Sequence, residues 1–330
     1  MLDRVRPVPV HGLLQTDDVL PWLLEWRRGG HRAALVTVVN VEGGSPRSVG
    51  AQLAVSERGS YVGYLSGGCL EQAVASEALT AIREGHNRFV RYGKDSKYLD
   101  IRLPCGAGLD VYIDQSFDAD LVAELAAAHA RRSIVALRTD LGTGQSCIVQ
   151  LPAQADGAPS SQREGDVFTR VYVPSLKLLV IGIGPAVAAI ARLASSIGLD
   201  IEASSPNEAT QAELIAADIA PRAMSAAAFP FSFRPDHWTA AVLAFHEHHW
   251  EPPIIAHLLD MPCFYIGALG SRATQASRLQ ALREHGVSED RLARVRGPIG
   301  LIAGAKSRAS LAIGVLAEIM AEAKERHFVA

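Results

Sequence analysis

Along the second half of the chain, short apolar runs alternate with longer segments in which apolar residues recur every three or four positions. The apolar runs predict buried strands, and the periodic segments predict amphipathic helices. The strands are expected at 177–181, 200–203, 240–245 and 263–266, and the helices at 186–196, 208–217, 253–259, 272–285 and 310–324. Because neighbouring parallel strands need crossover connections, this order predicts a doubly wound parallel sheet with helices on both faces.

The first half has a less regular pattern that mixes both periods. Its helices are expected at 17–28, 69–83 and 118–131, and its strands at 33–41, 51–55, 61–65, 109–113, 134–138 and 147–151, the last two pairing across a turn. A polar stretch rich in Pro, Gly, Ser and Ala, residues 152–165, separates the two halves. We therefore predict a mixed α/β domain over residues 1–165 and a doubly wound α/β domain over residues 166–330.

Composition and charge narrow the class of protein. The 330 residues are 48% hydrophobic and 20% charged, as in ordinary globular domains, and the net charge of −3 supplies no broad field for a nucleic acid. No apolar run approaches the roughly 20 residues that cross a bilayer, and the N-terminus lacks a signal-peptide pattern. The four cysteines form no close pair, which fits a reducing compartment. We expect a cytoplasmic protein with no membrane or nucleic-acid partner.

A glycine loop opens the second domain. Gly182 and Gly184 follow a predicted strand and precede a helix, the context in which backbone N–H groups bind a pyrophosphate. However, Pro185 removes one donor, Val187 occupies a position where a small residue is usual, and the next strand ends at 203–206 without an acid for the ribose. A nucleotide site and a scaffold that has lost its ligand both remain open.

Two loops of the first domain concentrate unusual residues. The first loop contains Gly44, Ser45, Pro46, Arg47 and Gly50. Its glycines permit close backbone approach, and its arginine can clamp a phosphate or carboxylate. A surface loop with a solvated arginine is the alternative.

The second loop reads Ser66, Gly67, Gly68, Cys69, Leu70, Glu71 and leads into a helix. The pattern predicts Gly68 as N-cap, Cys69 as the first helical residue and Glu71 as the third, so that free N–H groups favour an anion or a thiolate there, while Glu71 opposes it. Cys105 with Gly106 repeats the combination of a thiol and glycine. Two such thiols indicate soft-metal or sulfur chemistry, with a small buried residue at a tight turn as the alternative.

Two further places in the second domain are candidates for ligand contact. His246 and His248 follow a predicted strand and are expected to point to one side, where they would contact a ligand or a metal; a polar loop at the strand end is the alternative. Trp250 rules out an HExxH zinc motif. Gly270, Ser271 and Arg272 begin a helix and form a second candidate anion site.

These motifs carry a family resemblance. Residues 44–51, 66–71 and 104–106 resemble the N-terminal domain of xanthine dehydrogenase accessory proteins, the XdhC/CoxI family, and residues 265–272, 297–305 and 311–319 are similar to the family's Rossmann-like domain. The resemblance covers about residues 15 to 323. It implies a maturation factor that binds the molybdenum cofactor (molybdopterin or its dinucleotide), supports its sulfuration and delivers it to an apo molybdenum hydroxylase such as xanthine dehydrogenase.

The chain departs from the family pattern mainly in the second domain. Pro185 and Val187 replace the family's His and Ala, and the segment 300–305 lacks its Asp. We therefore expect the cofactor on the first-domain loops, with Arg47 at its phosphate and with Cys69 ligating molybdenum or relaying sulfur, assisted by Cys105. The resemblance also implies a cysteine desulfurase as sulfur donor, and a chain of this kind is expected to form a homodimer.

No general base is evident, which favours a chaperone over an enzyme. Two other functions remain open. An NAD(P)-dependent oxidoreductase would use the second domain, and a scaffold would recruit a sulfur donor without binding the cofactor itself.

Overall fold

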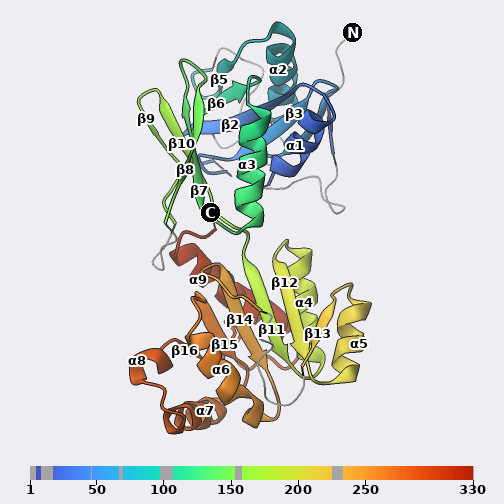
Figure 1. Cartoon of the computed structure of the whole chain (residues 1–330), viewed down its shortest axis with the longest axis vertical. Coiled ribbons are helices and arrows are strands. Elements are labelled where there is room, and N and C mark those ends of the chain that lie inside the picture. The colour runs from blue at the N-terminus through green and yellow to red at the C-terminus, as the bar shows by residue number, and fades with distance from the viewer. Residues whose placement is uncertain are drawn as a thin grey trace. The chain divides into compact units, whose positions relative to one another are not determined.

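The computed structural model describes residues 5–8, 18–45, 47–66, 70–96, 106, 108–152, 158–224 and 233–329. The chain divides into two compact units (Figure 1). The first comprises residues 1–152 and 159–173, and the second comprises residues 153–158 and 174–330. No helix within the described ranges is long and apolar enough to span a membrane.

The first unit is built on a six-stranded sheet with the strand order β1-β4-β3-β2-β6-β5. Its strands are β1 (Arg6–Pro7), β2 (Ala33–Glu42), β3 (Gln52–Ser56), β4 (Ser60–Gly63), β5 (Arg88–Gly93) and β6 (Gly108–Asp114). All pairs are antiparallel except β1 with β4. The predicted strands are confirmed, and β5, which was not predicted, forms one edge.

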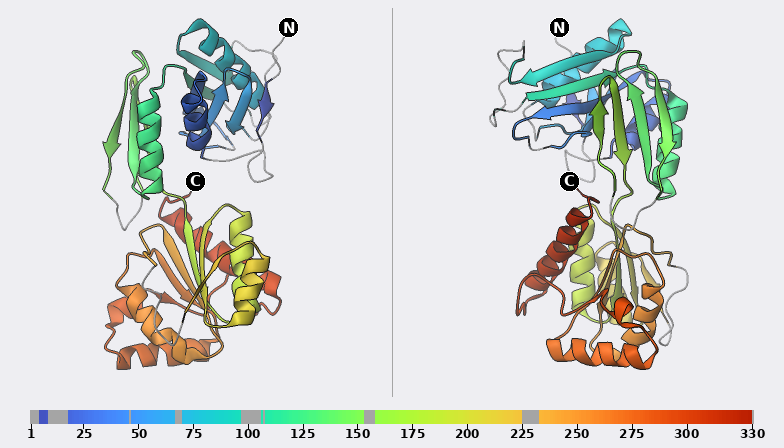
Figure 2. Two further views of the ribbon diagram at one scale, coloured as in Figure 1. Left: turned by 45° about the vertical axis from the view of Figure 1, so that its right-hand side comes forward. Right: turned by 90° about the vertical axis from the view of Figure 1, so that its left-hand side faces the viewer.

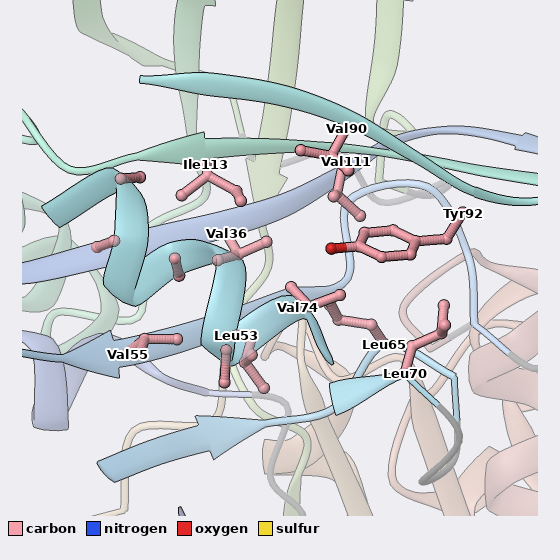
Figure 3. Packing of buried hydrophobic residues seen from close by; sticks show 14 of the residues in the cluster. Val36, Leu53, Val55, Leu65, Leu70, Val74, Val90, Tyr92, Val111 and Ile113 are labelled. Atoms are coloured by element: carbon pink, nitrogen blue, oxygen red, sulfur yellow. The ribbon is translucent and has the colours of Figure 1, made fainter. Parts of the chain in front are cut away.

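Alternate residues of β2 face opposite layers, as its apolar run requires. Ala34, Val36 and Val38 lie in a core cluster with helix α2 (Glu71–Glu84), whereas Ala33 and Leu35 lie in a second cluster with α1 (Leu20–Arg28) and α3 (Ala119–Ala130). Figure 3 shows the first cluster, in which Val74 of α2 packs against the sheet. Both faces of the central strand are therefore buried.

A four-stranded antiparallel sheet, in the order β8-β7-β10-β9, completes the first unit. Its strands are β7 (Val135–Asp140), β8 (Ser146–Gln150), β9 (Gln162–Glu164) and β10 (Val167–Tyr172). The predicted pairing of 134–138 with 147–151 is confirmed. Strand β10 follows the polar stretch and pairs with β7, so the chain returns to the first unit before it enters the second.

The second unit is the predicted doubly wound domain. Its six strands are all parallel and lie in the order β13-β12-β11-β14-β15-β16. They are β11 (Lys177–Gly182), β12 (Asp200–Ser205), β13 (Pro221–Ala223), β14 (Thr239–Ala244), β15 (Tyr265–Ala268) and β16 (Val295–Arg296). The fold class is thus confirmed.

Helices cover both faces of this sheet (Figure 2). They are α4 (Pro185–Ser196), α5 (Glu208–Ala216) and α9 (Arg308–Glu325) on one face, and α6 (Glu251–Leu259), α7 (Arg272–Glu284) and the short α8 (Glu289–Leu292) on the other. The strand order reverses between β11 and β14, which is where open α/β sheets bind ligands beyond the carboxyl ends of their strands.

Candidate functional site

Three loops of the first unit, residues 43–51, 64–70 and 94–107, leave its sheet at the same end of the strands, which we call the loop edge. Glu42 at the end of β2 lies opposite Gly108 at the start of β6, and Gly93 at the end of β5 also pairs with Gly108. On the other side of β2, Gly63 at the end of β4 pairs with Leu53 near the start of β3. The antiparallel topology therefore places the strand ends that flank the segments 43–51, 64–70 and 94–107 at one end of the sheet, and these segments carry the predicted cofactor residues of this domain.

Arg47 connects two of these loops. Its Nη1 donates to the Tyr64 hydroxyl at 2.9 Å, and its guanidinium carbon lies 4.1 Å from the centre of the Tyr64 ring. Its backbone N–H donates to the Ser45 hydroxyl at 3.3 Å. This cation–π contact and the hydrogen bond orient the guanidinium beside the second loop.

Gly50 fixes the return of the first loop into β3. Its φ is +93°, and a β-carbon there would stand 2.8 Å from the Ser161 hydroxyl oxygen. Its N–H donates to the Val38 carbonyl at 2.7 Å. Close packing inside the first unit and the positive φ therefore require glycine at position 50.

Glu71 closes the second loop. Its carboxylate is 5% exposed and accepts hydrogen bonds from the backbone N–H groups of Leu65 and Ser66, each at 2.8 Å, and of Leu70 at 3.2 Å. The Ser66 hydroxyl also donates to Glu71, at 3.1 Å to Oε2. The loop 66–70 is therefore held at both ends by one buried side chain.

The electrostatics of Glu71 follow from these bonds. Burial by itself raises the pKa of the Glu71 carboxyl, but the hydrogen bonds from Leu65 and Ser66 outweigh it, so the pKa is lowered. The carboxylate is therefore charged in the folded protein. Leu65 and Leu70 are fully buried beside Val74 and Tyr92, which anchors the same loop in the core (Figure 3).

The predicted start of the following helix is wrong by two residues. Helix α2 begins at Glu71, with Leu70 as N-cap. Glu71 is thus the first helical residue, and its side chain turns back to the preceding loop. The physical reason is that the carboxylate accepts hydrogen bonds from three backbone N–H groups that precede the helix. These bonds hold residues 65, 66 and 70 outside the helix, so that it starts at Glu71.

Charged residues at the base of the first and third loops were not predicted. Glu42 pairs with Arg91 and Lys94, and Arg91 also pairs with Asp110 at 3.0 Å. The Asn40 side-chain amide donates to Asp110 at 2.9 Å. These ion pairs join the ends of β2, β5 and β6. Because the charges neutralise one another, we assign them a structural role at the loop edge. The alternation in Arg88–Gly93 was the signal that predicts β5.

Several predicted site residues lie outside the described part of the chain. They are Pro46, Gly67, Gly68, Cys69 and Cys105. The metal-ligand roles of Cys69 and Cys105 therefore stay predictions. Within the described ranges, no group of three or more His, Cys, Asp or Glu side chains is placed to hold a metal ion. Gly44 is exposed, and Gly106 has a φ of +69°.

The predicted residues of the second unit meet at the carboxyl edge of its sheet. Gly182 ends β11, and a β-carbon there would stand 2.1 Å from the Ala244 carbonyl oxygen at the end of β14. Gly184 is the N-cap of α4, with a φ of +98°, and a β-carbon on it would lie 3.6 Å from Nε2 of His246. The glycine loop and His246 are therefore neighbours at the topological switch point.

One backbone N–H of this glycine loop, that of Gly184, already has an acceptor within the second unit. The Gly184 N–H donates to the buried Thr210 hydroxyl of α5 at 2.8 Å. Both serines at the end of β12 are fully buried, and the Ser204 hydroxyl donates to the Arg222 carbonyl while the Ser205 hydroxyl accepts from Asn207. The Gly184 N–H and the two serine hydroxyls are thus engaged in hydrogen bonds within the second unit.

His246 and His248 do not lie on a strand. Strand β14 ends at Ala244, and residues His248–Trp250 form a 3₁₀ turn, so strand alternation does not apply to them. His246 is exposed at the strand end. The turn leads directly into α6, and this early helical start ends the extended conformation.

Hydrogen bonds hold the third candidate site of the second unit, residues 270–272, in place. Ser271 caps α7 by accepting from the Thr274 N–H at 3.1 Å, between Gly270, with a φ of +147°, and the exposed Arg272. The Leu269 carbonyl, one residue earlier, accepts from Arg278 at 2.7 Å.

Arg278 itself forms a buried ion pair that the sequence did not reveal. It bonds Glu251 at 2.8 Å, and the two side chains are 1% and 0% exposed. The partners come from α7 and α6, far apart in the sequence, and the pair holds the loop after β15 in place.

Comparison with known proteins agrees with these two units. Residues 26–93 match the XdhC and CoxI family, and residues 178–319 match the XdhC Rossmann domain. The mixed first unit and the parallel second unit therefore define a protein of the XdhC type. The chain belongs to the XdhC and CoxI family, as the sequence motifs predicted.

Two curated relatives cover most of the chain. The molybdenum cofactor insertion chaperone PaoD of Escherichia coli (strain K12) is 34% identical over 310 residues, which span 92% of this chain and 88% of PaoD. A probable xanthine dehydrogenase component of Bacillus subtilis (strain 168) is 26% identical over 325 residues, which span 87% of this chain and 92% of that protein. A crystal structure described as a xanthine dehydrogenase from Bacillus halodurans shares the fold, with a TM-score of 0.74, 23% identity and coverage of 93% of this chain and 96% of that one.

Proposed function

We propose that the protein is a maturation factor for a molybdenum enzyme and that it holds the molybdenum cofactor on the loop edge of its first unit. The observation that carries this proposal is that the strand ends flanking the segments 43–51, 64–70 and 94–107 all lie at one end of the sheet. The 34% identity to a molybdenum cofactor insertion chaperone supports the same role.

The chemistry of the loop edge suits an anionic cargo. The Arg47 guanidinium is permanently charged, and its contact with Tyr64 orients it. The planar set of N–H donors on a guanidinium matches the geometry of a phosphate. None of the described atoms lies within 4 Å of the place where a β-carbon on Gly44 would stand, so packing does not require glycine at this position. A bare backbone there lets a ligand approach the loop closely.

The finer assignments extend this proposal. Cys69 ligates molybdenum or relays sulfur, Cys105 assists it, a cysteine desulfurase supplies the sulfur, and a homodimer delivers the cofactor to the apo-hydroxylase. A chaperone must release its cargo, and a few exchangeable contacts suit release better than a closed metal cage. The cofactor takes either the mononucleotide or the dinucleotide form.

Anaerobic equilibrium titration of purified protein with free molybdenum cofactor tests the proposal. We expect Arg47→Ala and Cys69→Ala each to weaken binding at least about tenfold, equivalent to about 1.4 kcal/mol. The matched controls are Arg58→Ala, an exposed arginine in the turn between β3 and β4 at the opposite edge of the sheet, and Cys147→Ala, an exposed cysteine on β8. Neither control should change the affinity.

The same titration includes NAD and NADP as competitors. Absence of cofactor binding together with tight NADP binding would overturn the proposal and favour an oxidoreductase that uses the second unit. Activation of the client enzyme without any cofactor binding would favour a scaffold that recruits the sulfur donor.

A further inference from the structure

A small apolar patch lies on the second unit, outside the loop edge. Three large hydrophobic side chains are exposed there, Leu301 at 62%, Ile302 at 43% and Ile313 at 51%. Leu301 and Ile302 follow β16, and Ile313 lies in the first half of α9. We call these three residues the 301–313 patch. Adjacent exposed apolar side chains of this kind are typical of interaction sites.

The patch is held rigidly by backbone contacts. The Leu301 N–H donates to the Gly314 carbonyl at 3.1 Å, and a β-carbon on Gly314 would lie 3.2 Å from the Ile302 nitrogen. The preceding Gly300 N–H donates to Glu318 at 2.5 Å, and the other oxygen of that carboxylate accepts from the Tyr265 hydroxyl at 2.9 Å. The backbone that carries the apolar side chains is therefore held in place, and a preorganised backbone lowers the entropy cost of binding.

The exposed charged residues around the patch are basic. The segment 297–317 contains two charged residues, Lys306 and Arg308, and both are exposed. Helix α4, which packs against α9, contains one charged residue, Arg192, which is also exposed. The chain as a whole has a net charge of −3, so this basic surface is a local feature.

The carboxylates nearest along α9 are engaged inside the unit. Glu318 accepts the hydrogen bonds described above, and Glu322 pairs with Arg296 and Arg326. Glu322 is therefore neutralised by its arginine partners, whereas the partly buried Glu318, whose donors are uncharged, keeps its negative charge.

We infer that the 301–313 patch docks a partner protein whose surface has an apolar depression edged by carboxylates. The inference rests on the proposed function in identifying this partner as the apo molybdenum enzyme. A second copy of this chain fits less well, because a twofold interface over this patch would bring the basic residues of both copies close together.

Sedimentation and surface plasmon resonance with a purified apo molybdenum hydroxylase from the same organism, made in cells that lack the cofactor, test the inference. The double variant Leu301→Ser/Ile313→Ser should raise the Kd at least about tenfold. Lys306→Glu/Arg308→Glu should slow association and weaken its dependence on salt. Ile215→Ser is the matched control, because Ile215 is 64% exposed on α5, away from the patch, and it should leave the Kd unchanged.

Cofactor binding by each variant is measured in parallel. A weakened complex with unchanged cofactor affinity supports the inference. An unchanged Kd in the double variant, no complex with the wild type, or dissociation of a homodimer by the patch substitutions would each overturn it. If the wild type forms the patch-dependent complex but binds no cofactor, the docking surface stands and the proposed cargo role fails.

Discussion

Replacing Glu71 tests whether one buried carboxylate organises the second loop. Glu71→Ala removes the acceptor for the buried N–H groups of Leu65 and Ser66, whereas the Leu70 N–H keeps its bond to the Ser66 hydroxyl at 2.9 Å. Each such donor costs about 1–3 kcal/mol, and partial relaxation or water entry reduces the sum. We therefore expect the first unit to lose roughly 3 kcal/mol of unfolding free energy.

Glu71→Gln separates charge from shape. The amide oxygen still accepts from Leu65 and Ser66, but the amide nitrogen then faces the Leu70 N–H, so one donor meets another. A charge-assisted bond is lost, and we expect a cost of about 1–2 kcal/mol. The control is Glu84→Gln on the same helix, since Glu84 is 55% exposed and its surface ion pair with Arg88 contributes about 0.5 kcal/mol.

The Glu71 substitution also has a defined pH dependence. Because the folded-state pKa of Glu71 is lowered, its carboxylate stabilises the fold above the unfolded-state pKa, and this stabilisation is lost as the pH falls through the folded-state pKa. Glu71→Gln removes this part of the acid dependence.

The assay combines urea unfolding with hydrogen exchange of the segment 62–72. Faster exchange at residues 65, 66 and 70, together with lower stability, is the expected result. Wild-type exchange rates in Glu71→Ala, or an equal effect of Glu84→Gln, would refute the reasoning.

Three further substitutions test the framework of both units. Gly50→Ala places a β-carbon 2.8 Å from the Ser161 hydroxyl at a φ of +93°, and should lower the calorimetric Tm of the first unit by an amount equivalent to about 1–3 kcal/mol; an unchanged Tm would contradict this. Glu251→Gln removes the negative partner of the buried Arg278 charge and should lower the free energy of unfolding of the second unit, measured in urea, by about 3–5 kcal/mol. A loss below about 1 kcal/mol would contradict this expectation. Burial raises the pKa of Asp114, so the wild type should gain stability as the pH falls from its folded-state pKa towards about 4, and Asp114→Asn should abolish that gain; equal pH slopes of Tm in both proteins would exclude this origin.

The sequence predicted the elements that follow from local periodicity. The alternation of apolar runs and amphipathic segments from residue 177 onward predicted the parallel sheet and its long helices, because buried parallel strands are apolar on both faces. Strand β5 was missed because its charged residues, Arg88 and Arg91, are paired with carboxylates from α2, β2 and β6. Such pairs join segments far apart in the chain, so a local pattern does not reveal them.

The site shows the same division. Sequence alone singled out the glycine loops and the residues Arg47 and Glu71, since glycine, arginine and acid in a loop differ from ordinary turn composition. Only the tertiary structure decided their roles. Glu71 became a backbone acceptor inside the loop, and Gly184 gave its N–H to Thr210 of another helix.

What the sequence by itself determined is therefore most of the helices and strands, the family and the candidate residues. What the tertiary structure decided is which of these residues meet at one edge and which are used by the protein's own framework. The physical reason is that periodicity and turn preference act over a few residues, whereas burial, charge pairing and hydrogen-bond satisfaction depend on partners that the fold brings together.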